Sequence, residues 1–431
     1  MTLEEKLCSL ESYDAFSDIL EGERLLPLQT VDTLKMLFRK KGVLMYDTGM
    51  GKTYVACALI KALLNQNPHR HFLMFVKNKQ LSQTPAKMSR LTGFDVLGCT
   101  GQSADLKECL LSGRFRMYTV VLLAHSCLHQ EEFLKFLAEN KEWFDVIFID
   151  EAHALNNFNE GISGAAIAAL CKGKEFVWAL TATPMTSSLM QCAKLATILD
   201  PFNYAKTQKL LTGLRTGKYQ IGQDPCFWIS RDRKDFGVTA EVRGHALAVE
   251  AMPHQIGLQA GEVLRKCKGA GAENQAKALA DFIKRQSGKG LVFINEHATR
   301  EWVLPFLEEA DIRYACINGR TNAGDTETIL YNFNELDQYD VLITSVTEAL
   351  DLECSWVLFY EFTTNVQQMI GRAYRGFANK VLDVYFMVTI GAGEIEWFCE
   401  HILSRARTVS QKLDKYYTAV YQAAVEMRKY Q

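Results

Sequence analysis

Short and almost uninterrupted apolar runs recur along the chain, with room for a helix between each run and the next. In the first half they read GVLMY, HFLMFV, MYTVVLLA, FDVIFID and FVWALTAT, and in the second half GHALAV, GLVFIN, RYACIN, DVLITSV, WVLFYEF and LDVYFMV. Apolar residues at nearly every position, rather than at alternate positions, are typical of parallel strands that are buried on both faces. With helical segments between the strands, the pattern predicts doubly wound α/β domains.

The two series of strands are separated by a glycine-bearing stretch, LLTGLRTGKYQIGQDP, at residues 210–225. A chain of 431 residues is too long for one ordinary core, so two domains are expected. We predict a first domain over residues 1–235 and a second over residues 236–431. A charged amphipathic helix or pair of helices in residues 394–428 is expected to close the second domain on its surface.

Composition and charge narrow the class of protein. The chain is 48% hydrophobic and 23% charged, as in soluble globular proteins. Its apolar runs fall far short of the roughly 18 residues that span a bilayer, and the acidic N-terminus lacks the apolar core of a secretory signal. The 12 cysteines include no Cys-x-x-Cys pair, which favours free thiols in a reducing cytosol over zinc ligands or disulfides. The net charge is only −2, so any nucleic acid must be bound through local contacts.

The stretch VLMYDTGMGKTYVACALI, residues 43–60, contains the end of a phosphate-binding loop. Gly51, Lys52 and Thr53 fit the template Gly-x-x-x-x-Gly-Lys-Ser/Thr, but Tyr46 stands where the leading glycine is expected. A strand precedes this loop and a helix follows it, so backbone N–H groups and the helix N-terminus can hold phosphates there. Lys52 would then reach the β- and γ-phosphates, and the Thr53 hydroxyl would bind Mg²⁺. The alternative is a glycine turn that only caps a helix.

Two further strand ends carry candidate chemistry. FDVIFIDEAHALNN ends an apolar strand in Asp150 and Glu151, about 100 residues after the loop. The carboxyl edge of an open parallel sheet is where ligands bind, so Asp150 is assigned to the metal and Glu151 to the attacking water. In WALTATPMTSS, Thr181 and Thr183 end another strand, where their hydroxyls sense the nucleotide or simply cap the next helix.

Near the end of the chain, VQQMIGRAYRGF carries a third group of polar residues. Gln368, Arg372 and Arg375 have the spacing Gln-x-x-Gly-Arg-x-x-Arg. Residues three apart share a face of a helix, so the two arginines can stabilise charge on a transferring phosphoryl group. A merely solvated basic face is the alternative.

Taken together, these elements resemble the two-lobed motors of helicase superfamily 2, with a DEAH-type box at residues 150–153. YDTGMGKT, DEAHALNN, TATPMTSSLMQCAKLATILDPFNY and ISRDRKDF resemble segments of its Swi/Snf-like branch, and KGLVFINE, INGRT, NFNE, VLITSV and VYFMVTIGAGEIE have counterparts in the same order. The resemblance covers roughly residues 25–400. That branch also places a non-glycine residue at the position of Tyr46.

The resemblance implies two tandem RecA-like doubly wound parallel-sheet lobes with an ATP cleft between them. It implies ATP and Mg²⁺ as cofactors, with Gln29 reading the adenine and the loop from Thr48 to Thr53 holding the phosphates. For nucleotide binding the resemblance implies Gln29, Thr48, Gly49, Met50, Gly51, Lys52 and Thr53, and for the metal ion it implies Thr53 and Asp150. For catalysis it implies Lys52, Glu151, Gln368, Arg372 and Arg375. It also implies that His153, Thr181 and Thr183 couple ATP hydrolysis to closure of the two lobes.

Two departures from the family pattern bear on function. Leu28 replaces the aromatic residue that usually precedes the adenine-reading glutamine. The segment TSVTEALDLEC has Glu348, Ala349, Asp351 and Glu353 in place of three glycines and an asparagine of the family, and added carboxylates weaken contacts to phosphates. The chain also shows no long insertion, reader module or nuclease domain, which suggests a minimal phage, mobile-element or bacterial motor.

The sequence therefore predicts a nucleic-acid-stimulated, Mg²⁺-dependent ATPase that moves along DNA, most simply duplex DNA. A strand-separating helicase that acts on forked DNA or RNA is the first alternative. A nucleotide-binding module that a protein partner activates is the second, motivated by the altered TEALDLE segment. We expect a monomer without membrane contact in the cytoplasm of a bacterium or a phage-infected host, with targeting supplied by a protein partner.

Overall fold

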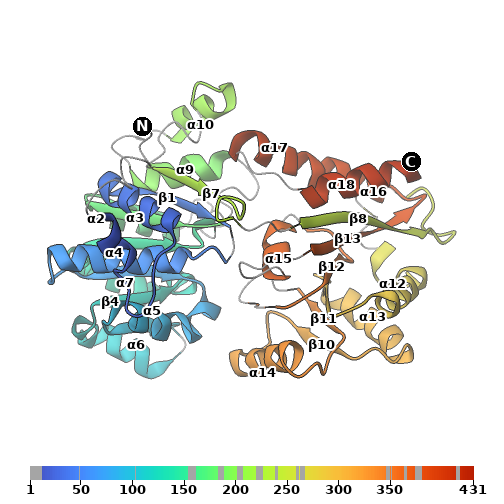
Figure 1. Cartoon of the computed structure of the whole chain (residues 1–431), viewed down its shortest axis with the longest axis horizontal. Coiled ribbons are helices and arrows are strands. Elements are labelled where there is room, and N and C mark those ends of the chain that lie inside the picture. The colour runs from blue at the N-terminus through green and yellow to red at the C-terminus, as the bar shows by residue number, and fades with distance from the viewer. Residues whose placement is uncertain are drawn as a thin grey trace. The chain divides into compact units, whose positions relative to one another are not determined.

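The computed structural model describes residues 12–47, 49–101, 103–153, 162–182, 189–200, 207–219, 227–237, 241–258, 262, 267–345, 350, 352–363, 366–373, 381–413 and 418–431. The chain divides into two compact units, Met1–Phe236 and Gly237–Gln431 (Figure 1). Each unit is built on its own parallel sheet.

Within the described residues, the first unit holds a seven-stranded sheet with the order β3-β4-β2-β5-β6-β1-β7, and all its pairings are parallel. The strands are β1 (Lys41–Tyr46), β2 (Phe72–Val76), β3 (Val96–Cys99), β4 (Val120–Ala124), β5 (Val146–Asp150), β6 (Phe176–Leu180) and β7 (Trp228–Arg231). Every residue of β2, β4, β5 and β6 is buried, as expected for strands covered on both faces.

Helices lie between these strands in the chain. The α-helices are α2 (Ser12–Ser17), α3 (Pro27–Arg39), α4 (Lys52–Gln66), α5 (Thr84–Thr92), α6 (Ala104–Leu111), α7 (Glu131–Glu139), α8 (Ile162–Cys171), α9 (Leu189–Leu199) and α10 (Thr207–Thr216). Short 3₁₀ helices are η1 (Asn78–Ser82), η2 (Arg114–Met117), η3 (His125–His129) and η4 (Lys141–Trp143).

The second unit repeats this construction. Its described residues form a six-stranded parallel sheet with the order β10-β11-β9-β12-β13-β8. The strands are β8 (Glu241–Glu250), β9 (Gly290–Phe293), β10 (Tyr314–Ile317), β11 (Val341–Thr344), β12 (Trp356–Phe359) and β13 (Val381–Ile390). The helices are α12 (Glu273–Arg285), α13 (His297–Glu309), α14 (Ala323–Asn334), α15 (Val366–Ala373), α16 (Glu394–Trp397), the π-helix η6 (Phe398–Leu403), α17 (Ser404–Leu413), α18 (Thr418–Met427) and the 3₁₀ helix η7 (Arg428–Tyr430).

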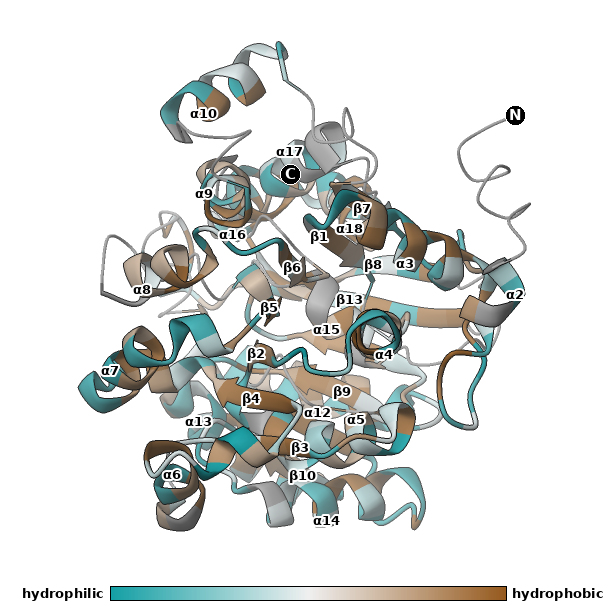
Figure 2. Ribbon diagram, turned by 90° about the vertical axis from the view of Figure 1, so that its left-hand side faces the viewer, coloured by the Kyte–Doolittle hydropathy of each residue, from teal (hydrophilic) through white to brown (hydrophobic). Residues whose placement is uncertain are grey.

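Burial of apolar surface holds both sheets in place. In Figure 2 strands such as β1 and β4 are brown, whereas α7 has both brown and teal sides. On α7 the apolar side is formed by Phe133, Phe136 and Leu137, which are buried, while Glu131 and Glu132 face solvent. Such two-sided helices bury their apolar stripe in the interior of the unit and leave the charged stripe in water.

The last helix closes the free edge of the second sheet. The strand β8 lies at that edge, and side chains of α18 accept hydrogen bonds from its backbone: Gly244 N–H donates to Gln422 Oε1 at 2.7 Å and Ala246 N–H to Glu426 Oε2 at 2.8 Å. A Cβ at Gly244 would lie 1.9 Å from the carbonyl oxygen of Ala419, so only glycine permits this approach.

The predicted fold class, two tandem RecA-like lobes with doubly wound parallel sheets, is confirmed. Two strands were absent from the prediction. The short β3 has buried and half-buried residues in alternation, and the second half of β7 is polar, so neither gives an uninterrupted apolar run. The helix α10 also occupies residues that the glycine pattern assigned to a break between the two strand series.

Candidate active site

Four neighbouring strands of the first sheet end at one edge, and most of the predicted site residues of the first unit lie at the ends of three of them, β1, β5 and β6. The strands are β2, β5, β6 and β1, which lie side by side in this order and are all parallel. Lys77, Asp150, Thr181 and the loop after Tyr46 therefore come together although the sequence separates them widely. This edge is where open α/β sheets bind their ligands.

The phosphate loop runs from the end of β1 into the first turn of α4. Gly49 and Gly51 both have left-handed backbone conformations, with φ of +85° and +86°. The conformation of Gly51 favours glycine, and a Cβ there would lie 2.3 Å from the side-chain nitrogen of Gln29 and would displace that amide. The helix begins at Lys52, and its first N–H groups have no acceptor within the helix, which makes this end suited to an anion.

Gln29 connects the loop to the helix α3. Its side-chain oxygen accepts a hydrogen bond from Leu26 N–H at 2.9 Å, and its side-chain nitrogen donates to the Met50 carbonyl at 3.0 Å. The residue is buried. The predicted adenine-reading residue is thus held beside the phosphate loop, while Leu28 next to it is only half-buried.

Lys52 and Asp150 form the charged centre of this edge. Lys52 Nζ donates to the Tyr46 carbonyl at 3.2 Å. The two oxygens of Asp150 accept from Glu151 N–H at 2.9 Å and from Gln80 Nε2 at 3.1 Å. Burial, and then the negative charge of Glu151, raise the pKa of Asp150 to about 6, while the Lys52 ammonium opposes that rise. A buried carboxylate with a raised pKa is favourable for binding a cation.

Glu151 is held in an unusual conformation beside His153. Its φ of +47° is in the left-handed region, which is uncommon for a residue with a side chain. Glu151 Oε2 lies 3.3 Å from His153 Nδ1, and the Thr181 hydroxyl lies 3.1 Å from the same nitrogen. Lys77 Nζ is 3.1 Å from His153 Nε2, and since an ammonium can only donate, Nε2 is the acceptor and Nδ1 carries the proton.

His125 supports the end of β5 from the neighbouring segment. Its Nε2 lies 2.8 Å from the Asp150 carbonyl oxygen, which can only accept, so Nε2 donates. Burial lowers the pKa of His125 to about 4, and the ring therefore stays neutral at neutral pH. We assign it to holding the Asp150 backbone rather than to proton transfer.

For several other predicted site residues, the structure describes only the backbone or lacks a description. Gln368 and Arg372 lie on α15 in the second unit, and the structure describes their backbone but not their side chains. Thr48, Thr183 and Arg375 lie outside the described residues. In the altered TEALDLE segment, Glu348, Ala349 and Asp351 also lie outside them, whereas Glu353 is described, and its N–H donates to Asn334 Oδ1 at 3.1 Å.

The sequence analysis missed three residues that contact the predicted centre: Lys77, Gln80 and His125. Gln80 is the most informative, because its oxygen accepts from Lys77 N–H at 3.0 Å while its nitrogen donates to Asp150. One signal was available, since Lys77 and His125 each directly follow a predicted strand. Strand order, which the sequence did not reveal, is needed to know that these strand ends meet.

The residues present fit a Mg²⁺ ion that is shared with a nucleotide. Among the described residues, no three His, Cys, Asp or Glu side chains gather into a site that could hold a metal by themselves. Mg²⁺ bound with nucleotides takes only one or two protein ligands, the rest being phosphate oxygens and water. The buried Asp150 carboxylate and the Thr53 hydroxyl are donors of the required kind.

Two family models match parts of the chain. Residues 27–186 match the family model described as "Type III restriction enzyme, res subunit", and residues 274–376 match "Helicase conserved C-terminal domain". Together the two matches support a member of helicase superfamily 2. No curated protein matches the chain significantly. Among solved structures, the chain is similar to the Sulfolobus solfataricus SWI2/SNF2 ATPase core in complex with dsDNA, with 16% identity, 98% of each chain covered and a TM-score of 0.46.

Within the part of the chain that the structure describes, every helix is too short or too polar to cross a bilayer.

Proposed function

We propose that this chain, as a member of helicase superfamily 2, is a Mg²⁺-dependent ATPase motor that DNA stimulates and that moves along duplex DNA. One observation carries the proposal. The glycine loop, Lys52 and the buried Asp150 lie together at the carboxyl edge of the first sheet, where a nucleotide's phosphates and their metal ion require them.

In this proposal the first lobe binds and orients the phosphates. The loop around Gly49 and Gly51 offers backbone N–H groups, and the N-terminus of α4 offers more. Lys52 neutralises phosphate charge, and its hydrogen bond to the Tyr46 carbonyl keeps its ammonium at the mouth of the loop. Thr53 and Asp150 would hold Mg²⁺, which supplies charge neutralisation on the phosphates when bound.

Glu151 is the residue proposed to orient the attacking water and take its proton. Its neighbour His153 carries a proton on the nitrogen that faces both Glu151 and Thr181. The contact holds the Glu151 side chain in place and connects it to the end of β6. A change at Thr181 would therefore reach the proposed catalytic carboxylate through one imidazole ring, which supports the coupling role that the family resemblance implies for His153 and Thr181.

The second lobe is proposed to complete the site with Gln368, Arg372 and Arg375, whose positive charge would stabilise the transferring phosphoryl group. Three arguments support DNA as the track. The helicase C-terminal model matches the second lobe, the model matching the first lobe is named after a restriction-enzyme subunit, and the motifs resemble the Swi/Snf-like branch. That branch moves along duplexes without separating them, so we propose movement along DNA rather than unwinding.

Steady-state ATP hydrolysis tests the proposal. We expect hydrolysis that requires Mg²⁺ and rises with duplex DNA, and a loss of about 100-fold or more in Lys52→Ala. Lys61→Ala is the matched control, because Lys61 lies on the same helix and pairs with Glu21. No hydrolysis under any condition, or equal rates for Lys52→Ala and wild type, would contradict the proposal.

The nucleic acid is identified by comparing single-stranded DNA, duplex DNA, forked DNA and RNA as stimulators. Duplex DNA should stimulate most, and a strand-displacement assay on forked DNA should yield little product. Efficient displacement would replace the translocase proposal with a strand-separating helicase. ATP binding without turnover until another protein is added would support the partner-activated module instead.

A further inference from the structure

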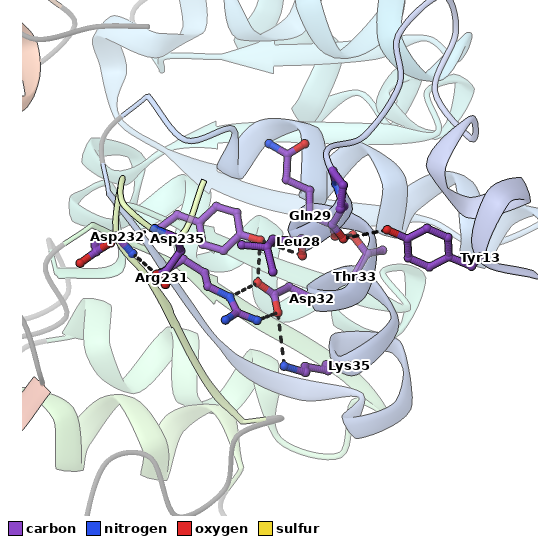
Figure 3. Close-up of polar contacts among 11 residues, drawn as sticks. Tyr13, Leu28, Gln29, Asp32, Thr33, Lys35, Arg231, Asp232 and Asp235 are labelled. Atoms are coloured by element: carbon purple, nitrogen blue, oxygen red, sulfur yellow. Dashed lines mark hydrogen bonds and ion pairs between the residues drawn. The ribbon is translucent and has the colours of Figure 1, made fainter. Parts of the chain in front are cut away.

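A buried cluster in the first unit joins α3, β1 and β7 through side chains to which the proposed chemistry assigns no role. We call it the Asp32 junction, and it consists of Asp32, Tyr46 and Arg231. Figure 3 labels Asp32 and Arg231 in this cluster. Arg231 donates to both carboxylate oxygens of Asp32, each at 2.9 Å, and the Tyr46 hydroxyl donates to one of them at 2.8 Å. Lys35 Nζ lies 3.6 Å from the other oxygen. The Asp32 side chain is fully buried.

Each end of Tyr46 contacts a different functional segment. Its backbone carbonyl accepts the hydrogen bond from Lys52 Nζ in the phosphate loop. Its hydroxyl reaches Asp32, and its ring packs edge-on against Phe236 with centroids 5.2 Å apart. Tyr46 occupies the position where the phosphate-loop template has a glycine, and a glycine there would make neither side-chain contact.

Arg231 ties the junction to the point where the chain leaves the first unit. It is the last residue of β7 and pairs with Tyr46 in the sheet, and its carbonyl accepts from Asp47 N–H at 3.2 Å. Residues 232–237, which we call the joint, follow at once, and the boundary between the two units falls after Phe236. Within the joint, Asp232 and Asp235 bond each other's backbone N–H groups in a tight turn (Figure 3).

Asp32 also lies one turn after Gln29 on α3, and Gln29 donates to Met50 in the phosphate loop. The junction therefore contacts the nucleotide side twice, through Tyr46 and through α3, and the joint twice, through Arg231 and Phe236. Replacing a buried ion pair with packed apolar residues of similar volume often leaves a protein equally stable. Stability alone is therefore a weak explanation for burying Arg231, Lys35 and Asp32 together.

We propose that the Asp32 junction positions the joint according to the state of the phosphate loop, with Tyr46 as the connecting residue. The inference rests on the proposed ATPase function. When Lys52 moves toward bound phosphates, its hydrogen bond to the Tyr46 carbonyl weakens and the end of β1 shifts. Because the Tyr46 side chain contacts Asp32 and Phe236, and Asp32 is bonded to Arg231, this shift moves those residues as well. These are positioning residues, since none of them belongs to the set proposed to contact the phosphates.

Hydrogen exchange at the joint tests this inference. The amides of residues 232–237 are followed with and without Mg²⁺ and a slowly hydrolysed ATP analogue, in wild type and in Tyr46→Phe. Phenylalanine keeps the ring against Phe236 but removes the hydrogen bond to Asp32. We expect the analogue to slow exchange at the joint by about tenfold in wild type and by less than about twofold in Tyr46→Phe. The affinity of Tyr46→Phe for the analogue should stay within about threefold of wild type.

Two further variants separate positioning from folding. Tyr118→Phe removes a tyrosine hydroxyl elsewhere in the same unit and should respond like wild type. Arg231→Lys keeps the positive charge but loses the bidentate hydrogen bonds to Asp32. Like Tyr46→Phe, it should therefore reduce the slowing of amide exchange at the joint. In both Tyr46→Phe and Arg231→Lys, KM for ATP should change little while the DNA-stimulated kcat falls.

The outcomes separate the two proposals. A joint that responds equally in wild type and Tyr46→Phe overturns the junction's role, as does a wild-type joint that does not respond while amides of the phosphate loop become protected. If the analogue changes exchange nowhere in wild type and ATP is not hydrolysed, the proposed function fails together with the inference.

Discussion

Two buried aspartates of the first unit, Asp32 and Asp150, interact with residues at its nucleotide loop, and their surroundings differ in kind. Asp32 is surrounded by donors, with a two-pronged arginine, a tyrosine hydroxyl and a nearby lysine. Asp150 has a glutamine and a backbone N–H, and its pKa is raised because burial and Glu151 outweigh Lys52.

The difference indicates that Asp32 stabilises the fold, whereas Asp150 is available to bind the metal ion. Around Asp32 the positive charge is supplied by the protein itself, so the ionised form is already compensated. Around Asp150 the compensation is incomplete, which costs stability but leaves the carboxylate favourable for a metal ion. Active sites commonly show this exchange of stability for function. Replacing each aspartate with asparagine should therefore have different consequences.

The largest effect is expected on hydrolysis in Asp150→Asn. The neutral amide is a poor Mg²⁺ ligand, so kcat/KM for ATP should fall by about 1,000-fold, which corresponds to about 4 kcal/mol of lost transition-state stabilisation. Steady-state hydrolysis at several Mg²⁺ concentrations measures this. A variant that keeps more than a tenth of wild-type activity would remove Asp150 from the metal site.

Asp32→Asn should lower the free energy of unfolding. It leaves Arg231 and Lys35, whose side chains are 14% and 6% exposed, without their counter-charge. Removing one partner of a buried ionic cluster costs about 3–5 kcal/mol. Urea unfolding measures the loss. If Asp32→Asn unfolds at the wild-type urea concentration, the Asp32 carboxylate does not stabilise the fold.

The pH dependence of stability should report Asp150 directly. Its pKa is raised from the ordinary 3.8 to about 6, so above pH 6 the folded state carries a buried charge that the unfolded state solvates freely. As pH falls from 7 toward 4, the folded state takes up the proton first and this penalty, at most about 3 kcal/mol, is relieved. The unfolding free energy of wild type minus that of Asp150→Asn should therefore increase toward acid. The titration of His125 occurs in both proteins and cancels in the difference. A difference that is constant with pH would contradict the raised pKa.

The smallest effect is expected from Gln80→Leu. Losing one hydrogen bond to a charged group should lower kcat/KM for ATP by about tenfold. Because Gln80 favours the ionised form of Asp150, its removal should also shift the acid limb of the rate profile to higher pH. The neighbouring exposed Gln83, replaced by leucine, is the matched control. An unchanged acid limb would show that Gln80 does not act on Asp150.

The sequence predicted the fold class, which is confirmed, and proposed a centre for the candidate site, because both depend on local patterns. Buried parallel strands read as continuous apolar runs, and the glycine loop with Lys52 is a motif of adjacent residues. Partners that lie far apart in the sequence were missed, as with Gln80 and Asp150, because their contact depends on β2 and β5 being neighbours. Arg231 was missed for the same reason, since its carboxylate partner lies 199 residues earlier in the chain.

The sign of the stability change in Asp150→Asn, measured beside Asp32→Asn by urea unfolding at pH 7.5, tests the central claim most directly. Relief of the buried charge, at most about 3 kcal/mol, should exceed the loss of about 1 kcal/mol from the weaker contact with Gln80. We therefore predict that Asp150→Asn unfolds at a higher urea concentration than wild type, while Asp32→Asn unfolds at a lower one. If both variants are destabilised, both carboxylates stabilise the fold, and the distinction between a stabilising Asp32 and a destabilising, metal-binding Asp150 is wrong.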